Sequence, residues 1–202
     1  FFFTHKTASA IRRRLVGSEM CIRDRIQAMY DNSWIFVTND QDDVEDMCDD
    51  IVHEIAHSLE EVHREIIYSD GFLEKEFLMK RQQIYSLLEG EGHKLDLFSF
   101  MDPIYNEEFD SLLYKEIGYP LLGELSSSIY YSPYSVTSLR EYFANGFENY
   151  FLGDNFLLKE ISPILYKKIN DLLFVFILRT KFMLPSPALE NVLIFSLSIK
   201  RL

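Results

Sequence analysis

Hydrophobic residues recur along most of this chain at the three- and four-residue spacing of amphipathic helices, and one short run has the composition of a strand. That run, residues 34–38, is β-branched and aromatic, and the Asn39-Asp40 pair ends it, so a β-strand is predicted. A dense acidic stretch follows. Because acidic side chains favour the positive end of a helix dipole, we expect a long helix from about Asp42 to Ile66.

Four further segments have helical patterns, and each has a recognisable start or end signal. They cover residues 73–88, 106–117, 138–151 and 162–173. Gly90 and Gly118 are expected to end the first two, and Ser138 to cap the third, with Glu141 completing a capping box. The Tyr-, Ser- and Pro-rich residues 119–137 are expected to form an ordered loop beside a functional site. The pattern as a whole predicts a predominantly helical α+β fold with a small sheet.

The first 25 residues do not have the pattern of a protein element. Residues 15–25 resemble the translation of a sequencing adapter, in which the codons ATG TGT ATA AGA GAC encode the run MCIRD. We therefore assign residues 1–25 to a non-native scar and exclude them from fold reasoning. Residues 26–173 are expected to form one domain, and residues 174–202 an apolar tail that is either an out-of-frame extension or an extra packed segment.

The charge balance excludes several classes of partner. The chain has 20 Lys and Arg against 32 Asp and Glu, a net charge of −12; without residues 1–25 the balance is 14 against 30, or −16. So acidic a domain repels nucleic acid and anionic membranes, and neither is expected as a partner. No uninterrupted apolar run approaches the ~20 residues that span a bilayer. Cys48 is the only cysteine outside residues 1–25, so no intrachain disulfide is expected.

The strongest chemical signal is the HEIAH run at residues 53–57, inside the long predicted helix. Residues four apart lie one above the other on a helix, so His53 and His57 can bind one metal ion between them. Glu54 lies beside them, where a carboxylate can take a proton from a metal-bound water. This is the arrangement found in zinc proteases. The alternative is a surface helix that happens to carry two histidines.

A catalytic zinc ion takes three protein ligands, and His63 is one of two candidates for the third. It lies six residues after His57, which is the spacing of the metzincin proteases. Those enzymes carry Gly where this chain has Glu60, because the backbone must leave the helix there. On an unbroken helix, His63 lies about 240° round from His57. We therefore expect His63 to be a solvated helix residue, with a metzincin-type site as the alternative.

Glu141 is the second candidate, because a Glu on a second helix can meet the first helix side-on and complete a His-His-Glu site. Asn145 lies one turn later and projects onto the same face. It could accept a hydrogen bond from the non-ligating nitrogen of a bound histidine and so fix the tautomer of that histidine. A capping-box role for Glu141 alone is the alternative reading, and the two roles are compatible.

These motifs together resemble a known family. The HEIAH helix, the run EYFANGF at residues 141–147 and the Ser-Pro helix that begins at Ser162 resemble the catalytic domain of the anthrax lethal factor-like gluzincins. The resemblance covers about residues 34–173. It implies a zincin-like metalloprotease domain with a small sheet and two metal-bearing helices, and Zn²⁺ as the cofactor. It also implies the following site residues: His53, His57 and Glu141 as zinc ligands and Glu54 as the general base.

The resemblance extends to one tyrosine and fails at one position. The family places a Tyr seven residues before the Glu ligand, which here is Tyr134. Its hydroxyl would donate to the oxyanion or assist the leaving amine; ordinary packing in an aromatic loop is the alternative. The family has a second acidic residue where this chain has Asn145, so the role of that side chain differs here.

We therefore expect a zinc-dependent endopeptidase that hydrolyses a peptide or protein substrate. Glu54 would accept a proton from the metal-activated water and pass it to the leaving nitrogen. The strand at residues 34–38 would form the sheet edge on which an extended peptide lies. The rival expectation is a catalytically inactive zincin-fold interaction protein, in which any metal is structural.

Overall fold

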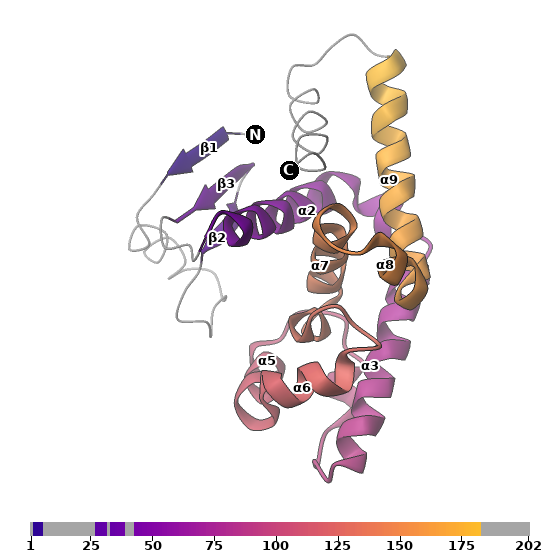
Figure 1. Cartoon of the computed structure of the whole chain (residues 1–202). Coiled ribbons are helices and arrows are strands. Elements are labelled where there is room, and N and C mark those ends of the chain that lie inside the picture. Colours follow the sequence, from indigo (N-terminus) through magenta and orange to yellow (C-terminus); the bar gives the residue numbers. More distant parts are fainter. Residues whose placement is uncertain (1, 6–26, 32, 39–42, 183–202) are drawn as a thin grey trace.

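The computed structural model describes residues 2–5, 27–31, 33–38 and 43–182, with no account of the side chains of residues 2–5 and 179–182 (Figure 1). This part of the chain is predominantly helical with a small sheet, which is compatible with the expected α+β class. The elements in order are β1 (Phe2–His5), β2 (Ala28–Asp31), β3 (Trp34–Val37), α2 (Val44–Tyr68), α3 (Phe72–Gly90), α4 (Leu97–Phe100), α5 (Glu107–Ser111), the π-helix η1 (Leu112–Ile117), α6 (Tyr119–Ser126), the 3₁₀ helix η2 (Pro133–Val136), α7 (Leu139–Leu152), α8 (Asn155–Ile161) and α9 (Pro163–Phe182).

The sheet has the strand order β1-β3-β2, with β1 parallel and β2 antiparallel to β3. The predicted strand is confirmed as β3, but the expectation that it forms the sheet edge is wrong, because β3 lies in the centre. The strand beside α2 is β2, which the sequence pattern did not reveal because its four residues, Ala-Met-Tyr-Asp, include no β-branched side chain (Figure 1). The strand β1 falls in the segment assigned to a scar, and that assignment stays a prediction.

The helices α2 and α7 pack closely against each other and against α9. Their contact faces bury Ala56 and Leu59 of α2 and Phe143 of α7 in one hydrophobic core. Gly146 allows the close approach of α9, because a Cβ atom at this position would collide with the side chain of Leu165. The packing therefore fixes α7 across the middle of α2, which is the part that carries the two histidines.

Arg81 on α3 is fully buried and holds two distant segments together. Its guanidinium lies against the rings of Phe77 and Phe109, and it donates hydrogen bonds to main-chain carbonyls. The carbonyls that it contacts belong to Ser99, Phe100, Asp102, Val136 and Thr137. The carbonyls of Val136 and Thr137 lie at the end of η2, directly before α7. Arg81 therefore fixes the position from which α7 begins.

The helices differ from the sequence prediction mainly between residues 119 and 182. The expected loop at 119–137 contains α6 and η2, since a Pro in the first turn of each is compatible with helix initiation. The short helix α8 was not predicted; Asp154 caps it by accepting from two main-chain amides. The helix α9 continues to Phe182, beyond the expected end at 173. Among the described residues, no helix is long and apolar enough to cross a membrane.

Candidate metal centre

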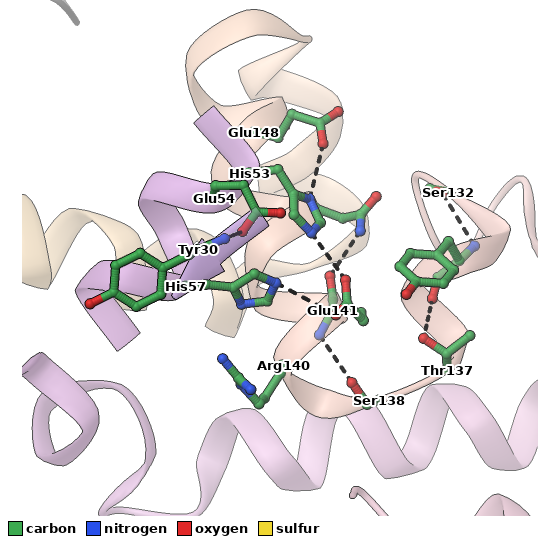
Figure 2. Close-up of polar contacts among 12 residues, drawn as sticks. Tyr30, His53, Glu54, His57, Ser132, Thr137, Ser138, Arg140, Glu141 and Glu148 are labelled. Atoms are coloured by element: carbon green, nitrogen blue, oxygen red, sulfur yellow. Dashed lines mark hydrogen bonds and ion pairs between the residues drawn. The ribbon is translucent and has the colours of Figure 1, made fainter. Parts of the chain in front are cut away.

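The structure brings His53, His57 and Glu141 together, as the sequence analysis predicts (Figure 2). The Nε2 atom of His53 lies 3.0 Å from Oε2 of Glu141, and the Nε2 atom of His57 lies 3.5 Å from Oε1 of the same carboxylate. One donor atom from each residue lies within 4.8 Å of the other two. In the described part of the chain this is the one such group of three potential ligands.

The donor atoms lie close enough to one another to surround a divalent ion. Ligand atoms at about 2.0–2.1 Å from a tetrahedral ion lie about 3.3–3.4 Å from one another. One carboxylate oxygen of Glu141 lies 3.0 Å from His53 Nε2 and the other lies 3.5 Å from His57 Nε2, on either side of that value. Two imidazoles and a carboxylate are also a donor set that binds divalent transition metals. This cluster could therefore hold a metal ion.

The local sequence explains why these side chains converge. Asp43 caps α2 by accepting from the main-chain amide of Asp46, and the four-residue spacing of His53 and His57 puts both on one face of this helix. Ser138 caps α7 by accepting from the main-chain amide of Glu141 at 3.2 Å. The carboxylate of Glu141 does not close a capping box but reaches the two histidines on α2.

The mutual contacts of the cluster shift the pKa values of all three side chains. Burial acts to raise the pKa of Glu141, but hydrogen bonds from His53 and His57 hold that pKa far below its ordinary value. Burial acts to lower the pKa of each histidine, but hydrogen bonds to carboxylates raise the pKa of His53 to about 10 and that of His57 to about 9. Ligation requires neutral imidazoles, so metal binding at this cluster must release protons.

Two carboxylates that the sequence analysis missed lie behind the histidines. The Nδ1 atom of His57 lies 3.3 Å from Oε2 of Glu60, and the Nδ1 atom of His53 lies 3.4 Å from Oε2 of Glu148. Such partners keep the proton on Nδ1, so that Nε2 faces the centre. The signal was present in the spacing, since Glu60 lies three residues after His57 and Glu148 seven after Glu141, each on the same helix face.

Asn145 lies on the expected helix one turn after Glu141, and its side-chain amide donates to the Glu141 carbonyl at 3.0 Å. The two Nδ1 positions that the sequence analysis considered for its hydrogen bond have Glu60 and Glu148 as neighbours. The role of Asn145 in fixing a histidine tautomer stays a prediction. Carboxylates, rather than Asn145, lie beside the two Nδ1 atoms in this structure.

Glu54 lies beside the cluster and is held by the edge strand β2 (Figure 2). Its Oε2 atom accepts a hydrogen bond of 2.6 Å from the main-chain amide of Tyr30. The Tyr30 hydroxyl donates to Glu61 at 2.6 Å, and the amide of Gln27 donates to Asp46 at 2.8 Å, so β2 is fastened along α2. Burial raises the pKa of Glu54, while the nearby histidines oppose that rise.

Tyr134 is half-buried in η2, directly before α7. The turn that carries it is closed by two hydrogen bonds, from its own amide to Ser132 Oγ and from Thr137 Oγ1 to its carbonyl. Burial raises the pKa of the Tyr134 phenol far above its ordinary value, and the nearby negative charge of Glu141 adds to the effect. The hydroxyl is therefore protonated and within electrostatic reach of the cluster. Its action on a substrate stays a prediction.

His63 is not part of the three-residue cluster. The expectation that it is solvated is wrong, because it is 7% exposed and its ring packs against Phe176 with centroids 4.9 Å apart. The cause is the length of α9, which continues past residue 173 and covers this side of α2. The backbone of α2 is also locally non-helical at His63, with φ −119° and ψ 24°.

Comparison of the chain with protein-family models, with curated proteins and with solved structures yields no match. The resemblance to the lethal factor-like gluzincins therefore stays a prediction that rests on the sequence motifs. The His53, His57 and Glu141 cluster is a candidate metal centre by its own geometry.

Proposed function

We propose that this domain is a zinc-dependent endopeptidase of the gluzincin type, with a zincin-like fold. The observation that carries the proposal is the convergence of His53, His57 and Glu141, with the Glu54 carboxylate adjacent on the same helix. A structural zinc site is normally closed by four protein ligands, whereas a catalytic site has three and leaves a position for water. The cluster has three potential ligands, and a purely structural site would need no base beside them.

A Zn²⁺ ion bound there would polarise the scissile carbonyl and lower the pKa of its water towards ~7. Glu54 takes the proton of the attacking water and transfers it to the leaving nitrogen. The main-chain amide of Tyr30 holds the Glu54 carboxylate in one orientation for this transfer. Tyr134, which keeps its phenolic proton, donates a hydrogen bond to the developing oxyanion or to the leaving amine.

The variant Glu54→Gln tests this proposal, measured by zinc content and by cleavage of a mixed peptide library with the full chain. We expect one zinc per chain and cleavage slowed about 10²–10⁴-fold, because a positioned general base contributes that much. The matched control is Glu65→Gln, which removes an exposed charge from α2 away from Glu54 and β2. Its cleavage rate should equal that of the unchanged chain.

Two results would contradict the proposal. Unchanged cleavage by Glu54→Gln with zinc bound would exclude the hydrolytic mechanism. A zinc-loaded unchanged chain that cleaves no peptide in the library would favour the inactive interaction protein.

A further inference from the structure

Glu60 is a buried carboxylate that contacts both helices of the candidate metal centre. Its side chain is 6% exposed and receives hydrogen bonds from three donors. The Oε2 atom lies 3.3 Å from Nδ1 of His57 and 2.9 Å from Nε of Arg140, and the Oε1 atom accepts from the Tyr68 hydroxyl at 3.0 Å. Both oxygen atoms are thereby fixed, and the plane of the carboxylate is determined.

The partners of Glu60 place it between the metal ligands. His57 is a ligand on α2, and Arg140 directly precedes the ligand Glu141 on α7. A buried carboxylate requires a counter-charge, and the Arg140 guanidinium supplies one from the opposite helix. The Oε2 atom of Glu60 therefore contacts both the imidazole of the ligand His57 and the side chain of Arg140, which precedes the ligand Glu141.

We propose that Glu60 is a positioning residue of the metal centre. Its carboxylate keeps the proton of His57 on Nδ1, which turns Nε2 towards Glu141, and through Arg140 it sets the distance between α2 and α7. The inference rests on the proposed metal site but not on peptide hydrolysis. Glu60 stands where the metzincin pattern has Gly. The backbone stays helical at this position, and the Glu60 side chain contacts the ligand His57.

The expected magnitude follows from the chemistry of imidazole ligands. Either ring nitrogen can bind a metal, so an acceptor at Nδ1 removes the competing tautomer and the competing ring orientation. Loss of such a partner lowers metal affinity about 10–100-fold. Because the same oxygen atom serves Arg140, loss of the arginine should weaken the effect without abolishing it.

The test uses zinc affinity, measured in the full chain by competition with a chelator, and the visible spectrum of the cobalt-substituted protein. Glu60→Leu removes the acceptor and should weaken zinc binding about 10–100-fold and change the cobalt spectrum. Glu60→Gln retains a neutral acceptor and should recover part of the affinity. The control Glu65→Gln removes an exposed charge from the same helix and should leave both measurements unchanged.

A second variant keeps the inference testable if Glu60→Leu does not fold. Arg140→Met alters an exposed side chain and should lower zinc affinity several-fold through Glu60. Unchanged affinity and an unchanged cobalt spectrum in a folded Glu60→Leu, or in Arg140→Met if that variant alone folds, would overturn the inference. The readout is metal affinity, so a failure of the proposed peptidase activity would be seen separately, as zinc binding without cleavage by the unchanged chain.

Discussion

Two buried groups of charged side chains in this molecule differ in what their polar atoms contact. Arg81 directs its guanidinium at the main-chain carbonyls of two segments, residues 99–102 and 136–137. At the candidate metal centre, side-chain nitrogen and oxygen atoms from α2 and α7 face one another instead. The first arrangement satisfies groups of the fold itself, whereas the second gathers opposite charges around a common point.

The difference distinguishes a structural buried charge from a functional one. Main-chain carbonyls that are buried need donors, so Arg81 provides hydrogen bonds that the fold would otherwise lack. Two imidazoles and a carboxylate are not required to satisfy any main-chain group. Replacing the whole of such a buried cluster by apolar side chains is often neutral for stability, whereas removing one charged partner alone is destabilising. Substitutions at Arg81 should therefore affect folding, and substitutions at the metal centre should affect metal binding.

The largest effect is expected for Arg81→Met in the metal-free chain. The free energy of unfolding should fall by more than about 3 kcal/mol, because Arg81 serves five carbonyls and each buried carbonyl that loses its donor costs about 1–3 kcal/mol. Urea denaturation measures this change. The control Arg64→Met alters an exposed arginine on α2 and should stay within about 0.5 kcal/mol of the unchanged chain. A loss below about 1 kcal/mol at Arg81 would remove the contrast between the two groups.

Tyr134 lies where the two groups meet, since Arg81 holds the end of its turn and Glu141 follows it on α7. Tyr134→Phe should lower kcat for peptide cleavage about 10²–10³-fold and leave zinc affinity unchanged, because it removes one donor to the oxyanion. The control is Tyr131→Phe, whose hydroxyl contacts the Asp154 carbonyl. An unchanged kcat would show that Tyr134 packs without acting on the substrate.

The effect of zinc on Tm should distinguish Arg81 from the residues of the metal centre. Zinc at about 100 times its Kd should stabilise the chain by about 2.7 kcal/mol and raise Tm by about 5–10 °C, and a chelator should reverse the shift. In His57→Ala the shift should vanish, while Arg81→Met should keep it at a lower starting Tm. An equal zinc-dependent shift in His57→Ala would mean that the stabilising ion binds elsewhere.

The smallest effect is expected for Glu148→Gln. Its side chain is 25% exposed and lies 3.4 Å from His53 Nδ1, so water can take over part of its role. Zinc affinity should fall by less than about tenfold, less than for Glu60→Leu. Chelator competition measures both, with the exposed Glu124→Gln as control. A loss of zinc affinity larger than that of Glu60→Leu would show that Glu148 supports His53 more strongly than Glu60 supports His57.

The sequence predicted the elements whose signals are local. The helix α2, the strand β3 and the N-cap of α7 at Ser138 each follow from residues within a few positions of one another. The pairing of His53, His57 and Glu141 was also predictable, because helix periodicity fixes the first two and a recognisable motif marks the third. The missed strand β2 depends on pairing with β3 and on contact with α2, neither of which is visible in four residues.

The polar residues that support the site were missed for a physical reason. Arg81 falls four residues after Phe77 and three before Ile84, on the buried stripe of α3, but a charged side chain is normally expected in solvent. Carbonyls from distant segments, together with the rings of Phe77 and Phe109, make its burial favourable. His63 was expected to be exposed for a similar reason, since its cover, Phe176, lies on a part of α9 beyond the expected helix end.

The zinc content of the purified chain after dialysis, compared among the unchanged chain, Glu141→Ala and His63→Ala, tests the three-residue centre independently of activity. One zinc per chain is expected for the unchanged protein and for His63→Ala, and none for Glu141→Ala. Retention of a full zinc equivalent by Glu141→Ala, or its loss in a folded His63→Ala, would contradict the three-residue centre.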